Sequence, residues 1–203
     1  MCSSDLLRRH GIDGRERLVL VDRGDGVGAM PALQMAELAG HPNVAVLLGG
    51  MAAWEGELAE GAVELEPLRE SQAEFHANLG AMPTRQEIAD RLGDESLVIL
   101  DVRTPEEYSG RAGSPCDPRQ GHIPGARLVE LGELLIGPGQ PAPPEHIREL
   151  VGLPEGAEVV AYCHSGSRSA LAALALRAAG YSARNYPGSW HEWSRHDELP
   201  LER

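Results

Sequence analysis

VVAYCHSGSRSALAALALRAAG, residues 159–180, is the stretch from which the fold of this chain can be inferred. It starts as an apolar run of strand length, reaches Cys163, passes through a small polar loop and continues from Ser169 as an Ala- and Leu-rich run that predicts a helix. Similar apolar runs occupy 17–22 and 96–103, with helix-like segments between them. Strands alternating with helices predict an α/β fold, in which a mostly parallel sheet has helices on both faces. Ligands of such sheets bind beyond the carboxyl ends of the strands.

Three further segments carry signals of helix formation. Thr84 is followed three residues later by Glu87, the pattern of a capping box, and predicts that a helix begins there. The segment 143–152 predicts another helix, and 128–135 predicts a helical turn.

The first part of the chain is a weak copy of the last part. Gly49 precedes Trp54 by five residues, as Gly188 precedes Trp193, but only the later copy has a cysteine at the end of its strand. The acidic segment 56–83 loses the strand pattern and predicts a linker. We therefore expect two related units.

Composition excludes several classes of function. The chain has 203 residues and a net charge of -13, so a nucleic-acid backbone or an anionic membrane surface would be repelled by most of its surface. No apolar run approaches the roughly 20 residues of a membrane span, and no secretion signal is recognisable, which predicts a cytoplasmic protein. Its three cysteines, Cys2, Cys116 and Cys163, are expected to be free thiols.

Cys163 stands where a reactive thiol would be placed. A thiol reacts as its thiolate, which an ordinary pKa of about 8.5 disfavours at neutral pH. A loop that runs into a helix N-terminus can supply inward-facing backbone N–H groups and a partial positive charge. Gly166 would let the loop curl, and Arg168 would add a full charge. The alternative is a buried structural cysteine, because free cysteine packs well in cores.

Four motifs, LDVRTPEEYSG, GHIPGA, YCHSGSRSA and YPGSWHEW, occur in that order along the chain. With them the chain resembles the rhodanese-like sulfurtransferases, particularly the tandem two-domain members. The resemblance implies that Cys163 carries sulfur as a persulfide and that the loop after it binds the substrate, with Asp101 and Arg103 supporting the loop. The implied substrate-binding residues are His164, Ser165, Gly166, Ser167, Arg168 and Ser169. It implies no metal and no organic cofactor.

The resemblance also implies a domain organisation. Residues 82–203 match a complete catalytic domain, and residues 1–70 match a partial, non-catalytic domain with its linker. We expect only two strands in the first unit, near 18–22 and 44–48, and little stability for that unit alone. It would pack on the catalytic domain or on another chain, unless Met1 is an internal start of a longer protein.

Related phosphatases and some arsenate reductases provide the nearest alternative chemistry. They need a loop one residue longer than the four residues between Cys163 and Arg168. The shorter loop favours a sulfur atom over a tetrahedral phosphoryl group.

The substrate within the family depends on two departures. Enzymes using 3-mercaptopyruvate tend to carry an arginine where this chain has Glu107, and Val-Thr where it has Ser167 and Arg168. Both departures favour thiosulfate as the donor, with cyanide or a thiol as the acceptor, and Arg111 and Arg119 are candidates to assist. The alternatives are a 3-mercaptopyruvate sulfurtransferase and a non-catalytic module that senses sulfur or docks a partner. The oligomeric state stays open.

Other residues carry weaker signals. Cys116 is either a bystander on a Gly/Pro-rich loop or a second thiol that reacts with Cys163. His122 in GHIPGA is expected at a structural corner, because no cluster with metal-ligand spacing accompanies it. Trp190 and Trp193 are either pocket walls or core aromatics.

Overall fold

The computed structural model describes residues 3–61 and 69–203, which form two compact units. Unit 1 comprises Met1–Ala81 and unit 2 comprises Met82–Arg203. Cys2 and residues 62–68 of the expected linker lie outside the described residues. In the described part, no helix is long and apolar enough to cross a membrane.

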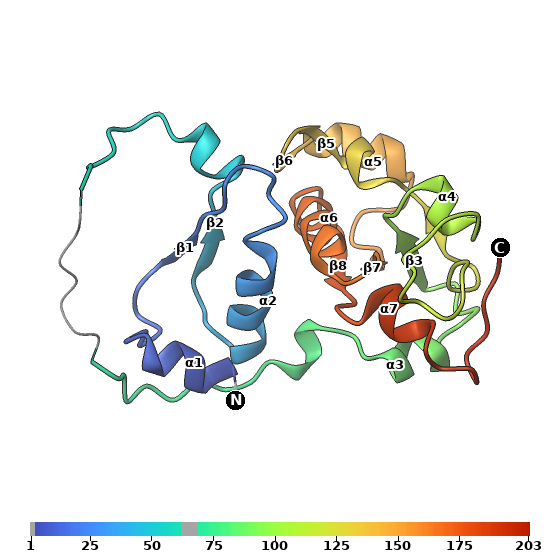
Figure 1. Ribbon diagram of the computed structural model, residues 1–203, viewed down its shortest axis with the longest axis horizontal. Helices are drawn as coiled ribbons and strands as arrows, with labels where there is room; N and C mark the ends of the chain where they lie inside the picture. The colour runs from blue at the N-terminus through green and yellow to red at the C-terminus, as the bar shows by residue number, and fades with distance from the viewer. Residues whose placement is uncertain (1–2, 62–68) are drawn as a thin grey trace. The chain divides into compact units, whose positions relative to one another are not determined.

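Unit 1 is built around a pair of short parallel strands (Figure 1). Both strands lie within the stretches that the sequence predicts. The helix between them ends at Gly40, whose φ of 80° closes the last turn in the left-handed conformation that glycine favours. The elements of this unit are α1 Ser3–Arg9, β1 Leu18–Leu20, α2 Met30–Ala39, β2 Val44–Val46, η1 Gly50–Ala53 and η2 Leu79–Ala81.

Unit 2 contains a four-stranded parallel sheet of order β4-β3-β7-β8. A separate antiparallel hairpin, β5–β6, follows the 3-10 helix η3. The strands are β3 Leu97–Asp101, β4 Arg127–Leu128, β5 Leu135–Gly137, β6 Gln140–Pro141, β7 Glu158–Tyr162 and β8 Ser182–Asn185. The helices are α3 Arg85–Asp90, α4 Pro105–Tyr108, η3 Leu131–Leu134, α5 Pro144–Val151, α6 Ser167–Ala178 and α7 Ser189–Trp193.

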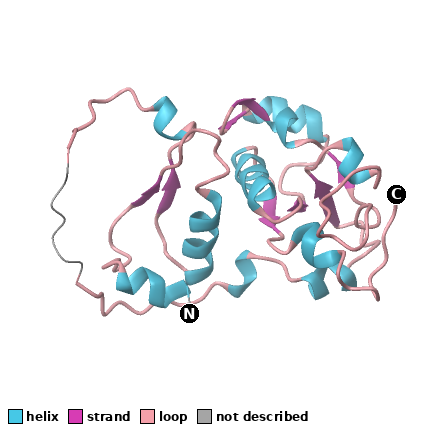
Figure 2. Ribbon diagram, in the orientation of Figure 1, coloured by secondary structure: helices cyan, strands magenta, loops and turns pink. Residues whose placement is uncertain are grey.

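Side chains of the central strand β7 alternate between two hydrophobic cores, as the pleat requires. Val159 and Ala161 pack in the core that contains α5 and α6, whereas Val160 and Tyr162 pack in the core that contains α3 and α7. The sheet therefore lies between helices on both faces (Figure 2). This confirms the predicted α/β class, with a parallel sheet that has helices on both faces.

The sheet also brings two predicted site residues to the same edge. Asp101 at the end of β3 is in register with Tyr162 at the end of β7, and Cys163 follows directly. Because the strands are parallel, both carboxyl ends open onto the loops that precede α4 and α6. The candidate site lies beyond these ends, where α/β sheets place ligands.

Candidate active site

The Cys163 sulfur lies at the start of α6 and is enclosed by donors. The residue is 1% exposed, and its Sγ accepts hydrogen bonds from the Gly166 N–H at 3.1 Å and the Ser169 hydroxyl at 3.3 Å. The N-terminus of α6, which begins at Ser167, adds the positive end of the helix dipole. Hydrogen bonds to an anion are stronger than those to a neutral group, so these donors suit an anionic sulfur atom.

Gly166 gives the loop its curl. Its φ is 87°, and a Cβ added there would lie 2.6 Å from the carbonyl oxygen of Pro187. Only glycine therefore fits between the loop and the chain after β8. Asn185 fixes the same peptide from the other side, since its side-chain amide donates to the Gly166 carbonyl at 3.1 Å.

The start of α7 holds the backbone of the cysteine. Ser189 is fully buried, and its Oγ accepts from the Cys163 N–H at 3.1 Å while donating to the Tyr186 carbonyl at 2.8 Å. The next two N–H groups, of Trp190 and His191, donate to the carbonyls of residues 163 and 164 at 3.0 and 2.9 Å. Sequence reasoning missed Ser189, whose signal was its place within YPGSWHEW.

Asp101 and Arg103 form a buried ion pair beneath the loop. Their side chains are 0% and 1% exposed, and Arg103 Nη2 lies 2.6 Å from Asp101 Oδ2. Arg103 also donates to the Gly121 carbonyl at 2.7 Å and lies 4.9 Å from the Trp190 ring centre. Burial is the largest influence and lowers the pKa of Arg103, but the hydrogen bonds to Asp101 and the attraction to nearby negative groups together outweigh it, and the net shift is upward. The pair thus joins β3, the GHIPGA corner and α7.

Arg168 is not free beside the sulfur. Its Nη1 and Nη2 each lie 2.9 Å from an oxygen of Glu107, which comes from α4. Hydrogen bonds to Glu107 are the main cause of the raised pKa of Arg168, and attraction to Cys163 also contributes. The bidentate pair holds the guanidinium near the sulfur and offsets part of its charge.

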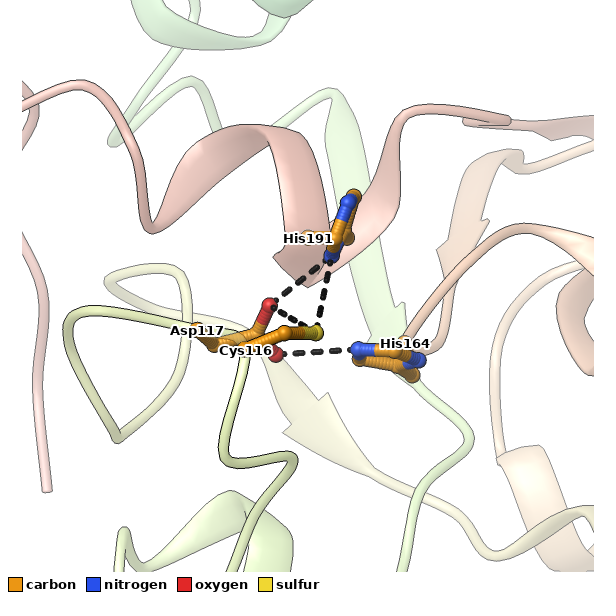
Figure 3. A group of neighbouring side chains, drawn as sticks. All are labelled: Cys116, Asp117, His164 and His191. Carbon is orange, nitrogen blue, oxygen red and sulfur yellow. Dashed lines mark hydrogen bonds and ion pairs between the residues drawn. The ribbon is translucent and has the colours of Figure 1, made fainter.

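The other predicted loop residues have different surroundings. Ser169 is buried and contacts the sulfur, whereas Ser165 is exposed and Ser167 and His164 are partly buried. The His164 ring points towards Asp117, with its Nε2 3.0 Å from the carboxylate (Figure 3). The backbone of His164 is therefore available to the Cys163 loop, whereas its ring contacts Asp117.

The two candidate arginines of the Gly/Pro-rich loop differ from expectation. Arg119 donates to the backbone carbonyls of Ser194, Leu199 and Trp193 at 2.9, 2.8 and 3.0 Å, so it caps the end of α7. Arg111 is 70% exposed and lies 3.8 Å from the carboxylate of Glu106. Both guanidinium groups thus have partners outside the Cys163 loop.

The structure also places four residues whose roles the sequence left open. His122 is buried, stacks on Tyr108 with ring centres 3.6 Å apart, and donates from its Nδ1 to the Tyr108 carbonyl at 2.9 Å, as expected for a structural corner. Trp190 and Trp193 are fully buried core residues. Cys116 is exposed and is a free thiol, as is Cys163.

The sequence profile described as the rhodanese-like domain matches residues 84–196. The chain belongs to this rhodanese-like family. A Mycobacterium tuberculosis protein named "Putative thiosulfate sulfurtransferase SseB" is 32% identical over 203 residues, covering 97% of this chain and 70% of that protein. A Pseudomonas aeruginosa protein named "Probable 3-mercaptopyruvate sulfurtransferase" is 33% identical over 205 residues, covering 96% of this chain and 70% of that one.

A solved structure is similar over almost the whole chain. It is the crystal structure of a protein described as a probable thiosulfate sulfurtransferase, with a TM-score of 0.78 and 33% identity, covering 99% of this rhodanese-like chain and 78% of that one. The relatives agree on sulfur transfer and differ in the donor for which they are named. The chain is thus a rhodanese-like sulfurtransferase.

Proposed function

We propose that this rhodanese-like protein is a thiosulfate sulfurtransferase that carries sulfur on Cys163. The observation that supports this most is the buried Cys163 sulfur, which accepts hydrogen bonds from Gly166 and Ser169 at the N-terminus of α6. The same donors that suit an anionic sulfur atom would hold the outer sulfur of a persulfide. The remaining loop amides, from His164 to Arg168, would complete this cradle.

The reaction is a double displacement. The Cys163 thiolate attacks the outer sulfur of thiosulfate, the bond between the two sulfur atoms breaks, and sulfite leaves with the electron pair. Cyanide or a thiolate then attacks the outer sulfur of the Cys163 persulfide. Thiocyanate or a new persulfide leaves, and the thiolate is regenerated. The chain's own groups suffice for both steps.

Thiosulfate is favoured over 3-mercaptopyruvate by the charge at residue 107. A carboxylate substrate needs a cation to clamp it, and this chain places Glu107 where enzymes using that substrate tend to carry an arginine. Arg168 supplies the available positive charge, although Glu107 already shares it. Thiosulfate needs only N–H donors around its sulfur and oxygen atoms, which the loop offers.

The test compares the wild-type protein with C163S. We expect thiocyanate from thiosulfate and cyanide with the wild-type protein and none with C163S. After thiosulfate treatment, intact-mass spectrometry should show a gain of one sulfur that cyanide removes and that C163S lacks. Turnover by C163S would contradict the proposal. A persulfide that forms from 3-mercaptopyruvate but not from thiosulfate would transfer the assignment to that donor, and no persulfide from either would favour a sensing or docking module.

Unit 1 has a separate proposed role. We infer that residues 1–70 are a partial, non-catalytic relative of the catalytic domain at 82–203. The support is the shared spacing of Gly49 and Trp54 with Gly188 and Trp193, and the parallel pairing of β1 with β2. Its partner, whether unit 2 or another chain, would cover its exposed apolar side chains.

A further inference from the structure

Four side chains of unit 2 converge beside the catalytic loop: Cys116, Asp117, His164 and His191 (Figure 3). One potential ligand atom from each lies within 4.8 Å of the other three. They come from the Gly/Pro-rich loop, the Cys163 loop and α7. We propose that this cluster is a binding site for Zn²⁺, independent of which sulfur donor the enzyme uses.

The donor set is the one that zinc prefers. Zn²⁺ binds thiolate sulfur at about 2.3 Å and imidazole nitrogen or carboxylate oxygen at about 2.0–2.2 Å, so donors of a tetrahedral site lie roughly 3.3–3.7 Å apart. Cys116 Sγ lies 3.7 Å from His191 Nδ1 and 3.7 Å from Asp117 Oδ1. Asp117 oxygens lie 2.9 Å from His191 Nδ1 and 3.0 Å from His164 Nε2. These distances lie within about 0.4 Å of those in a zinc site, so small side-chain shifts would bring the four donors to zinc spacing.

Two of these atoms are buried without a hydrogen bond. The Asp117 side chain is 0% exposed, and among the described residues neither its Oδ2 nor the facing His164 Nε2 has a hydrogen-bond partner. The two atoms face each other as an ion-pair contact whose orientation does not suit a hydrogen bond. An ion between them would satisfy both, because a metal binds the lone pairs that each presents.

The backbone under the cluster is held in place. Gln120 donates to the carbonyls of Ser114 and Asp117 at 3.2 and 3.1 Å, and the His191 N–H donates to the His164 carbonyl at 2.9 Å. Little of the chain would therefore have to become ordered when an ion binds. Side-chain exposures of 28% for His164 and 43% for His191 leave an approach from solvent.

In this structure, the Arg195 guanidinium provides the positive charge beside Asp117 and His191. Its Nη1 lies 3.1 Å from Asp117 Oδ1 and 2.9 Å from His191 Nδ1. The Nδ1 atom of His191 cannot both donate to Asp117 and accept from Arg195, so these contacts compete. The Arg195 side chain is 38% exposed, and it also donates to the backbone carbonyls of His191 and of Cys116, the latter at 2.7 Å. Zinc and the Arg195 guanidinium should therefore exclude each other.

Occupancy of the site would affect Cys116 directly. Binding releases the thiol proton and leaves a zinc-bound thiolate, which is blocked as an acceptor of sulfur or of an alkylating reagent. The ion would also join the Gly/Pro-rich loop to His164, the residue after Cys163. Zinc is therefore a candidate regulator of access to the catalytic loop.

The first test uses Co²⁺ as a spectroscopic probe of the C2S/C163S protein, in which Cys116 is the one remaining cysteine. We expect one Co²⁺ per chain, with the visible bands of a tetrahedral ion and a sulfur-to-cobalt charge-transfer band, both lost when Zn²⁺ is added. Adding C116S should abolish the charge-transfer band. Saturation without these bands, or a charge-transfer band that persists in C116S, would overturn the site.

The matched variants separate a metal site from an ion-pair network. H191A should weaken Co²⁺ binding at least tenfold, while H146A, which removes an exposed histidine of α5, should leave it unchanged. R195A should tighten binding several-fold, because the competing cation is gone. Thermal melting identifies any variant that fails to fold, and C116S changes an exposed side chain. Equal binding by H191A and H146A, or weaker binding by R195A, would contradict the proposal.

A second readout does not depend on spectroscopy. Zn²⁺ should slow alkylation of Cys116 by iodoacetamide at least tenfold in the same C2S/C163S protein, and R195A should reach the same protection at lower Zn²⁺ concentration. Alkylation that is unaffected by saturating Zn²⁺ would exclude Cys116 as a ligand.

Discussion

Glu107 determines how much positive charge Arg168 offers near the Cys163 sulfur. The carboxylate is 17% exposed and the guanidinium 32% exposed, so solvent screens the pair only partly. Burial is the largest influence and raises the pKa of Glu107, but the hydrogen bonds from Arg168 and from the Thr104 N–H, with the attraction to both arginines, together outweigh it, and the net shift is downward. Glu107 is therefore a carboxylate at neutral pH. An incoming anion meets an Arg168 guanidinium whose positive charge is already offset by this carboxylate.

Removing that carboxylate charge should strengthen binding of an anionic donor. E107Q keeps a hydrogen-bonding side chain of the same length, and we expect KM for thiosulfate to fall about threefold to tenfold, equivalent to roughly 1 kcal/mol. Steady-state kinetics of thiocyanate formation measures it. E106Q, at an exposed neighbour on α4, is the control and should leave KM unchanged. A KM that rises in E107Q would mean that the carboxylate positions Arg168 more than it neutralises it.

The same pair makes stability depend on pH. Because the pKa of Glu107 is lowered from its ordinary value of 4.5, its contribution is present above pH 4.5 and is lost as pH falls through the folded-state pKa. We expect wild type to exceed E107Q by about 1 kcal/mol in unfolding free energy at pH 7, and the difference to shrink below pH 4.5. Urea denaturation across this range checks it, and a difference that grows in acid would refute the sign.

Ser169 contributes the hydroxyl that contacts the sulfur. S169A removes the 3.3 Å hydrogen bond to Cys163 Sγ, and we expect kcat/KM to fall about threefold to thirtyfold, since a bond to a charged acceptor is worth roughly 1–2 kcal/mol. S165A, at an exposed position of the same loop, should stay near wild type. Equal losses in both variants would show that the loop as a whole, and not this bond, was disturbed.

At the level of single residues, sequence reasoning finds what a local motif contains. The loop from Cys163 to Ser169 could be predicted because the strand, the small residues and the helix follow each other directly. The Glu107–Arg168 pair could not be predicted from the sequence, because 61 positions separate the two residues and no spacing rule connects them. The cluster around Asp117 is missed for the same reason, as its members come from three separate segments.

The junction between β8 and α7 holds the catalytic loop through one strained residue. Ser189 has a φ of 52°, in the left-handed region that costs a non-glycine residue about 1 kcal/mol, and its buried hydroxyl bonds both Cys163 and Tyr186. The strain is offset by these two hydrogen bonds. Helix α7 then presents its first N–H groups to the carbonyls of the loop.

Two substitutions separate the hydroxyl from the backbone strain. S189A leaves the Cys163 N–H without its buried partner, and we expect a loss of about 1–3 kcal/mol in unfolding free energy. S189G loses the same hydroxyl but accepts the positive φ, so it should be less destabilised than S189A. Urea denaturation of both variants measures the difference. If S189A were as stable as wild type, the hydroxyl would have no structural role.

Among whole elements, sequence signals succeed where capping and packing agree. Thr84 accepts a hydrogen bond from the Glu87 N–H, so α3 begins where the predicted capping box places it. The segment 128–135 was expected to be a helical turn and is only partly so. It forms η3 and then enters the β5–β6 hairpin, a pairing with residues further along the chain that local periodicity does not report.

For the molecule as a whole, the alternation of strands and helices in the sequence predicts the α/β class, and the structure confirms it. The two units differ in what they bury. Unit 2 places two cores on the two faces of its sheet. Unit 1 has a two-stranded sheet and leaves Val19, Leu48 and Trp54 at 55%, 44% and 50% exposure. A sheet this small leaves apolar faces uncovered, which predicts lower stability for unit 1.

Limited proteolysis should reveal this difference. A glutamate-specific protease needs exposed, locally unfolded chain, and residues 51–61 are exposed throughout, as are Glu70 and Glu74. We expect the first cuts at these positions and a resistant product that starts near residue 75 and retains unit 2. That product should still form thiocyanate from thiosulfate, because Cys163, the loop and α7 all lie within it. Early cuts between 82 and 203 that precede loss of unit 1 would show that the catalytic unit is the less stable of the two.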